Sequence, residues 1–319
     1  MHPLNDPAIQ PFPSRVALPF KKVVPAMNPP PLPPAVAELF PFRRNFFETP
    51  DGAMHYVDEG PGERGNVVLF HGNPTWSFLW RDLIKALAAR GFRCIAPDHI
   101  GMGLSDKPAK FLRLADRIAH AEALIASLGL KKFSLCVHDW GGAIGFGVAV
   151  HAPERIEKIV ASNTAAFRSK AIPRRIALCK IPGFGPFLIK TFNAFALPAT
   201  RMAVRRRLAP AVRAGFLFPF PTPRSRTAIA NFVRDIPLSN AHPSMKTLVE
   251  IETALPRLAD KPMLLPWGGA DFCFGKVFFD EWKERFPRAE AIYRPDAGHY
   301  LLEDAGDALV PAITEFLSR

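Results

Sequence analysis

Residues 131–142, KKFSLCVHDWGG, decide how the rest of the chain is interpreted. The apolar residues of the first half alternate with Ser134 and Cys136, which is the pattern of a short buried strand. Asp139 comes soon after, and two glycines lead into a helix-like apolar run at 143–150. A strand that turns sharply into a helix, with a reactive side chain at the turn, is typical of a nucleophile elbow.

The residue at this turn is Asp139 rather than a serine. A carboxylate suits displacement at a saturated carbon, because the alkyl ester that it forms can later be cleaved at its carbonyl. A serine would form an ether, which could not be cleaved in that way. An aspartate here could also serve only to cap the helix. Its assignment as a nucleophile therefore depends on motifs elsewhere in the chain.

The length and composition indicate a globular protein with a large core. With 319 residues, 48% of them hydrophobic, the chain is long enough for one large α/β domain with an insertion, or for two domains. No apolar run reaches membrane-spanning length, and the first ten residues lack the pattern of a secretory signal. The four cysteines are widely spaced without metal-ligand pairing. We therefore expect reduced thiols in a cytoplasmic protein.

The net charge of +12 is unevenly distributed. Residues 158–234 contain fifteen Lys or Arg and no Asp or Glu, so the remainder of the chain is slightly acidic. Such a block could attract nucleic acid, an anionic membrane or an acidic protein. No nucleic-acid-binding motif accompanies it, so we expect no nucleic-acid partner. A solvated basic face without a binding role is the alternative.

Proline content separates the start of the chain from the rest. Residues 1–42 hold twelve of the 34 prolines, and we expect an arm without regular helix or central strand. From residue 43 onward, strands alternate with helices, which is the pattern of a doubly wound, mostly parallel α/β sheet. The predicted strands are 54–58, 66–70, 93–96, 133–137, 157–162, 261–267 and 290–293, and the predicted helices are 78–90, 112–128, 143–150 and 308–317.

The alternation breaks at residue 163 and resumes at residue 262. Residues 163–261 are rich in Arg, Phe and Pro and are mostly helical in pattern. We expect an inserted helical cap over the carboxyl ends of the strands, where open α/β sheets bind their ligands. The core would then comprise residues 43–162 and 262–319.

Two further turns after predicted strands carry residues for nucleophilic catalysis. Asp271 follows the strand that ends at Trp267, and His299 follows the strand that ends at Tyr293. Both turns should open at the same edge of the sheet as Asp139. Nucleophile, acid and histidine then occur in the chain order of the α/β-hydrolase triad. His299 would take a proton from water, and Asp271 would hold its tautomer and stabilise its charged form.

Asn73 and Trp140 complete the pattern. Each follows a predicted strand, and each offers a backbone N–H and a side-chain N–H. They could converge on an anion that departs next to the nucleophile. Ordinary core packing is the alternative for Trp140.

Together these motifs resemble the haloalkane dehalogenase family of α/β hydrolases. The resemblance covers the chain from about residue 42 to the end, and it is carried by HGNPTWSFLWR (71–81), PDHIGMGLSDKP (97–108), VHDWGG (137–142), WGGADFCF (267–274) and DAGHYLLED (296–304). It implies an α/β-hydrolase fold with an inserted helical cap. By motif match it implies Asp139 as nucleophile, His299 as base and Asp271 as its acid. It further implies Asn73 and Trp140 as the anion-stabilising pair, with no cofactor and no metal.

Related families differ from this chain at defining positions. Epoxide hydrolases share the HDWG elbow but activate the epoxide oxygen with cap tyrosines, and no tyrosine falls within 163–261. Fluoroacetate dehalogenases carry Arg after the nucleophile, where this chain has Trp140. Other dehalogenases use a tryptophan of the cap, which has none here. Another subgroup takes its acid from the turn near Ser162, where Asn163 and Thr164 offer no carboxylate.

Within this family the chain is most similar to the β-lactone decarboxylases of long-chain olefin biosynthesis. The stretches NTAAF (163–167) and DIPL (235–238) look like that group's cap boundaries. The resemblance implies a hydrophobic small-molecule substrate, a cis-dialkyl β-lactone that is converted to an alkene and CO₂. A haloalkane dehalogenase, which forms an alcohol and a halide, is the alternative. A non-catalytic binding protein with this fold is a remote alternative.

The predicted cap suggests how such a substrate arrives. Long dialkyl substrates are insoluble in water, so the basic, Phe-rich cap could dock on an anionic membrane or on other enzymes of the olefin pathway. The cluster of Arg205, Arg206 and Arg207 is the first candidate for this contact. We accordingly expect a cytoplasmic protein that can be peripheral to the membrane.

Overall fold

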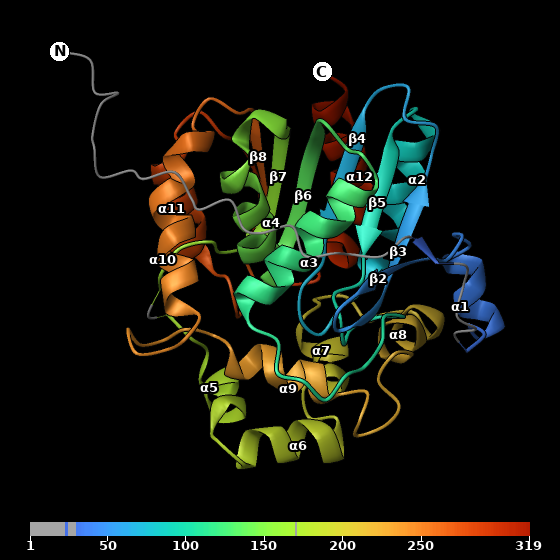
Figure 1. Cartoon of the computed structure of the whole chain (residues 1–319), viewed down its shortest axis with the longest axis vertical. Helices are drawn as coiled ribbons and strands as arrows, with labels where there is room; N and C mark the ends of the chain where they lie inside the picture. Colours follow the sequence, from blue (N-terminus) through green and yellow to red (C-terminus); the bar gives the residue numbers. More distant parts are fainter. Residues whose placement is uncertain (1–22, 25–29, 170) are drawn as a thin grey trace.

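The computed structural model describes residues 23–24, 30–169 and 171–319. These residues form a nine-stranded sheet with helices on both faces and a further group of helices beyond one end (Figure 1). The strands are β1 (Val23–Val24), β2 (Asn45–Thr49), β3 (Gly52–Glu59), β4 (Asn66–Phe70), β5 (Arg93–Pro97), β6 (Phe133–Asp139), β7 (Ile156–Thr164), β8 (Met263–Gly268) and β9 (Glu290–Arg294).

The sheet is parallel over most of its width. Its strand order is β1-β2-β3-β5-β4-β6-β7-β8-β9, with antiparallel pairing from β1 to β5 and parallel pairing from β5 to β9. The prediction of a doubly wound, mostly parallel sheet is confirmed, and β4 has its predicted bounds. β2 and the helix α11 (Lys276–Arg285) are not among the predicted elements.

Helices cover both faces of the sheet. On one face, α12 (Leu301–Ser318) packs on α2 (Arg81–Ala89), which the 3-10 turn η1 (Ser77–Trp80) precedes. On the other face lie α3 (Leu114–Ser127), α4 (Trp140–His151) and α11. Each face has its own buried apolar cluster. Burial on both faces explains why β4 is almost entirely apolar.

The cysteines agree with the expectation of reduced thiols. Cys94 lies in β5 and Cys136 in β6, both buried in the core, as predicted. All four cysteines are free in the described residues. In those residues no helix is both long enough and apolar enough to cross a membrane.

A second group of helices lies beyond the carboxyl ends of the parallel strands (Figure 1). They are α5 (Arg174–Lys180), α6 (Phe184–Phe192), α7 (Ala196–Met202), α8 (Pro210–Leu217) and α9 (Thr227–Arg234). The next helix, α10 (Met245–Ala254), and the turn η3 (Leu255–Leu258) pack instead on α4 of the core. The division into core and cap remains our proposal, and these contacts favour a cap that ends before α10 rather than at residue 261.

The expectation for residues 1–42 needs one correction. Residues 34–39 form a short helix, α1 (Pro34–Leu39), that contacts α8, although we expected no regular helix there. Proline is compatible with the first position of a helix, because the N–H at that position has no partner within the helix. Residues 1–22 and 25–29 of the predicted arm lie outside the described residues.

Candidate active site

The backbone places Asp139 at a strained turn between β6 and α4. Its φ of 53° lies in the left-handed region, which is uncommon for a residue with a side chain. The glycines that follow allow this turn. A Cβ on Gly141 would lie 2.0 Å from the carbonyl oxygen of Phe70, and one on Gly142 would lie 1.7 Å from Oγ1 of Thr164. The observed geometry is that of the elbow expected from the sequence.

Backbone amides hold the carboxylate of Asp139. The N–H of Asn73 donates to Oδ1 at 2.6 Å, and the N–H of Trp140 also bonds the carboxylate. Gly72 leaves room for it, since a Cβ there would lie 2.1 Å from Oδ1. Burial raises the pKa of Asp139 above its usual value, against the lowering effect of His299 and the two N–H groups. The ionised carboxylate is thus oriented but poorly solvated, which favours nucleophilic attack.

His299 lies between Asp139 and Asp271. Its Nδ1 is 2.8 Å from Oδ2 of Asp271, and its Nε2 is 3.8 Å from Oδ2 of Asp139. Burial opposes a charge on the imidazole, but the charge and hydrogen bond of Asp271 and the charge of Asp139 raise the pKa of His299 above its usual value. The pKa of Asp271 is lowered, because the effects of His299 outweigh the cost of burial. The arrangement can hold a positive charge beside Asp139.

Asn163 is a contact of this group that the sequence analysis does not assign. Its Nδ2 donates to Oδ2 of Asp271 at 2.9 Å and to the carbonyl of Gly268 at 3.0 Å, while its Oδ1 accepts from the N–H of Gly268 at 2.8 Å. It therefore fixes the Asp271 carboxylate and the turn that carries it. The sequence showed only that position 163 carries no carboxylate, and it gave no signal for the contact of Asn163 with Asp271.

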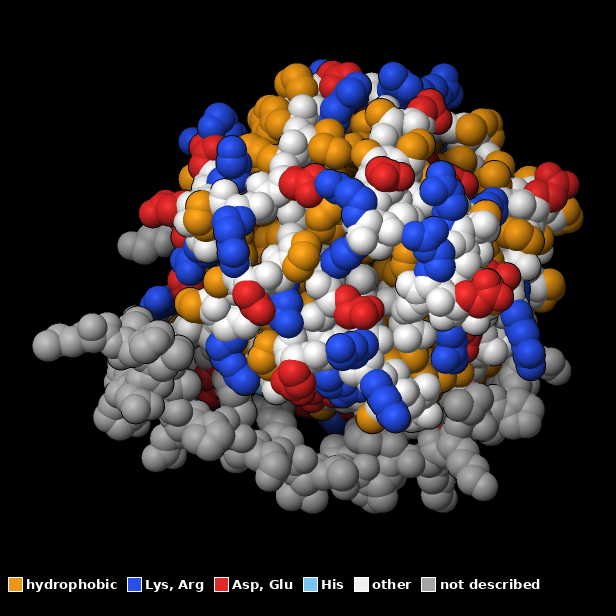
Figure 2. Space-filling view, turned by 90° about the horizontal axis from the view of Figure 1, so that it is seen from above, with side chains coloured by type: hydrophobic (Ala, Val, Ile, Leu, Met, Phe, Trp, Pro, Cys, Tyr) orange, Lys and Arg blue, Asp and Glu red, His pale blue; other side chains and the backbone are white. Residues whose placement is uncertain are grey.

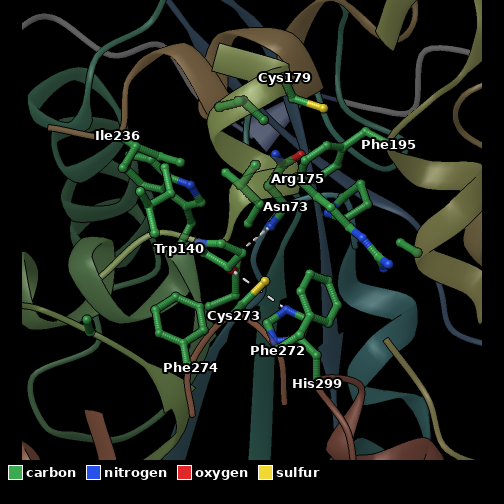
Figure 3. A pocket seen from close by; sticks show the side chains of 18 of the residues that line it. Asn73, Trp140, Arg175, Cys179, Phe195, Ile236, Phe272, Cys273, Phe274 and His299 are labelled. Atoms are coloured by element: carbon green, nitrogen blue, oxygen red, sulfur yellow. Dashed lines mark hydrogen bonds and ion pairs between the residues drawn. The ribbon is translucent and has the colours of Figure 1, made fainter. Parts of the chain in front are cut away.

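Asn73 and Trp140 both bond the carboxylate of Asp139 through their backbone N–H groups, and both line the same cavity (Figure 3). The side-chain Nδ2 of Asn73 donates to the carbonyl of Ile229 in α9 at 3.3 Å. An amide carries two hydrogens on this nitrogen, so the second stays available to an anion. Within the described residues, no acceptor is seen for the indole N–H of Trp140. The two side chains can therefore both donate to an anion in the cavity.

Helix α9 supports both members of this pair. Ile229 accepts from Asn73, and the ring of Phe232 packs edge-on against Trp140, with centroids 5.3 Å apart. The guanidinium of Arg117, itself buried, lies 3.5 Å from the centroid of the Phe232 ring. This cation–π contact ties α9 to α3.

Asp235 makes the second attachment of α9 to the core. Its buried carboxylate accepts from the N–H of Leu114 at 2.8 Å, at the start of α3, and from the hydroxyl of Ser244 at 2.7 Å. The guanidinium of Arg113 donates to it at 2.9 Å. The DIPL stretch, read in the sequence as a cap boundary, thus begins with a residue that fixes α9 on the core.

The cavity above Asp139 measures about 400 Å³ and is lined mostly by apolar side chains. Asp139, His299, Asn73 and Trp140 lie at its floor, and α5, α6 and α7 contribute much of the remaining lining. Such a cavity favours a hydrophobic ligand with one reactive polar group.

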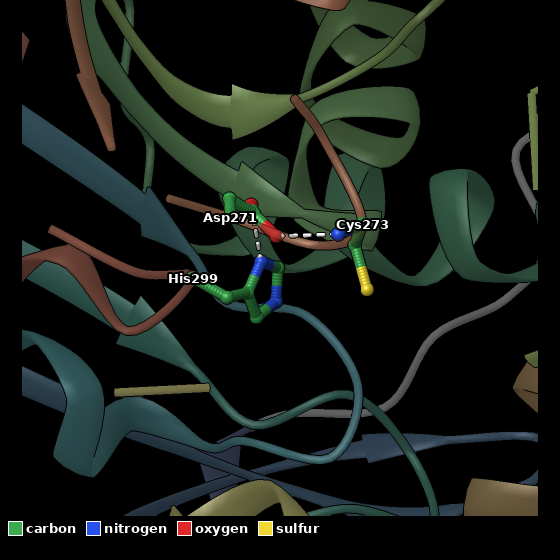
Figure 4. A group of neighbouring side chains, drawn as sticks. All are labelled: Asp271, Cys273 and His299. Carbon is green, nitrogen blue, oxygen red and sulfur yellow. Dashed lines mark hydrogen bonds and ion pairs between the residues drawn. The ribbon is translucent and has the colours of Figure 1, made fainter. Parts of the chain in front are cut away.

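Cys273 is the third member of the only candidate metal-ligand group found in the described residues (Figure 4). Possible ligand atoms of Asp271, Cys273 and His299 lie within 4.8 Å of one another. Asp271 and His299 already bond each other, and Asp271 accepts the N–H of Cys273 at 2.6 Å. Burial, and then the charges of Asp271 and Asp139, raise the pKa of the Cys273 thiol well above its usual value. Because the thiolate is the metal ligand, a metal ion here would have to offset that cost and replace the bond that Asp271 and His299 already share.

Other motif residues hold the scaffold together. Arg81 and Glu303 form a buried bidentate ion pair, with distances of 2.6 and 2.8 Å, that joins α2 to α12. Asp98 accepts the N–H groups of Ser77 and Leu104 at 2.7 and 2.8 Å. These bonds connect the stretches 71–81, 97–108 and 296–304, so parts of the motifs serve structure rather than chemistry.

Comparisons with known proteins agree with this fold. Residues 65–306 match the model of the family described as the alpha/beta hydrolase fold. The chain is 42% identical over 282 residues to a cis-3-alkyl-4-alkyloxetan-2-one decarboxylase of Xanthomonas campestris, with 85% of this chain and 94% of that protein covered. It is 34% identical to haloalkane dehalogenase 2 of Mycobacterium tuberculosis, over 87% of this chain and 96% of that protein.

The solved structures of similar fold include haloalkane dehalogenase DbeA from Bradyrhizobium elkani. It superposes with a TM-score of 0.79 and 26% identity, over 87% of this chain and 98% of the other.

Proposed function

The chain belongs to the α/β-hydrolase family, in the group of the β-lactone decarboxylases and haloalkane dehalogenases, and we propose that it decarboxylates cis-3,4-dialkyl β-lactones to alkenes. The observation that carries the proposal is the pairing of a buried Asp139 with two anion donors at the floor of an apolar cavity. The identity of 42% to a decarboxylase, against 34% to a dehalogenase, favours the lactone as substrate.

In the first proposed step, Asp139 opens the lactone ring. A carboxylate oxygen attacks the saturated ring carbon that is bonded to the ring oxygen. The bond between that carbon and the ring oxygen breaks, and its electron pair goes to the oxygen. The products of this step are an alkyl ester on Asp139 and a carboxylate on the neighbouring carbon. Asn73 and Trp140 would receive that carboxylate, since their side-chain N–H groups line the cavity beside the nucleophile.

In the second proposed step, the new carboxylate leaves as CO₂. The electron pair of its C–C bond forms the alkene, and the ester C–O bond breaks with its pair returning to Asp139. No water is consumed. His299, held by Asp271 and 3.8 Å from Asp139, would stabilise the charge that re-forms there.

A haloalkane dehalogenase remains the second candidate, because the first step is chemically the same with a halide as leaving group. Hydrolysis of the resulting ester would need His299 as the base that activates water. The hydrogen bond between His299 and Asp271 is compatible with that role as well. A binding protein without activity is disfavoured by the strained elbow, since strain of this kind is found mainly at functional sites.

The deciding experiment uses the purified chain with a cis-dialkyl β-lactone and, separately, with a 1-haloalkane. Gas chromatography for alkene and a halide assay measure the two products. Alkene formation at many turnovers per chain, with little or no halide release, supports the proposal. Halide release without alkene would instead establish the dehalogenase, and neither product would remove both candidates.

We also propose that the basic cap brings the protein to its substrate at a cytoplasmic membrane surface or at other enzymes of the olefin pathway. Its support is the block of fifteen basic residues without an acid at 158–234. The relatives themselves are named for small hydrophobic substrates only.

A further inference from the structure

Exposed hydrophobic side chains are concentrated in one part of the cap. Of the ten large hydrophobic side chains that are exposed among the described residues, six come from residues 178–197, with exposures from 41% to 61%. We call them the α5–α7 surface: Leu178, Ile181, Phe184, Phe187, Phe192 and Leu197. The rings of Phe187 and Phe192 contact each other, with centroids 5.7 Å apart. Clustered exposed apolar residues of this kind mark interaction sites.

The charged side chains that α5, α6 and α7 themselves carry are all of one sign. Arg174 and Arg201 are exposed on α5 and α7, Lys180 and Lys190 are half-buried on α5 and α6, and no acidic residue occurs from 158 to 234. The opposite end of the molecule differs, since Figure 2 shows acidic and basic side chains intermingled there. A surface that is apolar and basic complements a layer that is apolar and anionic.

The same helices lead to the candidate active site. Leu178 belongs both to the α5–α7 surface and to the lining of the cavity. Leu238 and Phe272 also line the cavity and are exposed, at 38% and 39%. Exposed apolar side chains therefore form part of the rim of the cavity, together with the exposed Arg175 of α5. A ligand with long alkyl chains could pass along these apolar side chains from an apolar layer to Asp139.

We propose that the α5–α7 surface docks on an anionic phospholipid bilayer and that the substrate enters the cavity from that bilayer. Aromatic and aliphatic side chains on one side of short helices, with basic residues nearby, are typical of interfacial membrane attachment. Exposed Phe side chains can enter the acyl boundary while Arg174 and Arg201 meet anionic headgroups. The route of entry rests on the proposed lactone substrate, but the docking itself does not.

The test mixes the full chain, without substrate, with vesicles of phosphatidylcholine alone or with added phosphatidylglycerol, and measures flotation at low and high salt. One variant combines Phe187→Glu and Phe192→Glu, and another combines Arg174→Glu and Arg201→Glu. These four side chains do not line the cavity.

Two matched controls use the same kinds of change elsewhere. Val277→Glu replaces an apolar residue that is 63% exposed on α11. Lys131→Glu with Lys132→Glu reverses two exposed charges just before β6, at the end of the sheet opposite to the cap.

The expected result is flotation of the wild type with phosphatidylglycerol vesicles, reduced by high salt. The Phe variant should bind at least about ten-fold more weakly at both salt concentrations, and the Arg variant at least about ten-fold more weakly at low salt. The controls should bind as the wild type does. Turnover of a short, water-soluble lactone should be equal in all variants, which shows that they are folded.

Three results would overturn the proposal. They are absence of vesicle binding by the wild type, an equal loss of binding in the controls, and capture of a protein partner by the α5–α7 surface without vesicle binding. Vesicle binding as expected, combined with no lactone turnover by any form of the chain, would support the docking surface and reject only the proposed function.

Discussion

Replacement of His299 separates the two mechanisms that this site can perform. In the proposed decarboxylation, His299 stabilises the carboxylate that re-forms at Asp139 and activates no water. In hydrolysis it is the base that cleaves the ester, and without it the ester should persist. We choose His299→Gln, because a glutamine amide can still donate to the buried carboxylate of Asp271, which would otherwise keep only its bonds from Asn163 and Cys273.

The magnitude follows from the separation of the two groups. Nε2 of His299 lies 3.8 Å from Oδ2 of Asp139. At an effective dielectric constant of about 20, two unit charges at this distance interact by roughly 4 kcal/mol. That energy is an upper bound on the stabilisation of the second step, and it corresponds to a loss of at most about 10³-fold in kcat. Alkene should remain the product, formed slowly by way of a transient ester.

The assay is intact-mass spectrometry over time after addition of a β-lactone, with alkene measured in parallel. Asp139→Asn in the same assay should give neither adduct nor alkene and so controls for non-specific acylation. A stoichiometric adduct of His299→Gln that stays stable for hours, with no alkene formed, would refute the elimination route and establish hydrolysis.

Three further predictions concern the same site. Asp139→Asn should lower kcat by at least about 10⁴-fold. The unfolding temperature of this variant should equal or exceed that of the wild type, because burial disfavours the charge of Asp139. Near-normal activity without deamidation would reject Asp139 as the nucleophile. The pKa of His299 is raised above 6.5 in the folded chain, so the charged imidazole adds to the free energy of unfolding. This contribution should be complete below pH 6.5 and lost as pH rises through the raised pKa. Decarboxylation with a charged His299 should lose kcat over that same rise, whereas hydrolysis with a neutral base should lose kcat as pH falls, and the pH profile of kcat distinguishes them. Phe232→Leu should weaken the binding of bromide about ten-fold, as measured by quenching of Trp140 fluorescence, because it removes a buried ring contact of about 0.5–2 kcal/mol. The control is Phe146→Leu, since Phe146 packs on a tryptophan outside the cavity. An equal loss of bromide affinity in this control would contradict the role of Phe232.

The fold could be predicted largely because the central parallel strands are buried on both faces and are rich in apolar residues. β4 and the elbow show this, with strand and helix positions close to those expected. β2 (Asn45–Thr49) has two adjacent buried residues, so it lacks the alternation that indicates a strand. α11 mixes apolar and charged residues without a clear face in the sequence, and its packing against β7 is evident only in three dimensions.

The site could be predicted only where residue type and chemistry coincide. Asp139, Asp271 and His299 stand in turns after strands, and the structure brings these turns together. Asn163 and Arg117 gave no such signal, because their roles depend on contacts with residues that are far away in the sequence. The carbonyl of Ile229 could not have been found at all, since every residue has one.

The anion pair has to serve two steps with opposite requirements. It must stabilise the carboxylate that leaves the lactone ring, yet a carboxylate held too strongly would keep the electron pair that the alkene needs. Only stabilisation that is greater in the transition state than in the bound state accelerates a step. Asn73 shares its amide with the carbonyl of Ile229, and that leaves Trp140 as the donor without a protein acceptor in the described residues. A pair of moderate strength, fixed in place by α9, therefore suits ring opening followed by loss of CO₂ better than a site built to retain an anion.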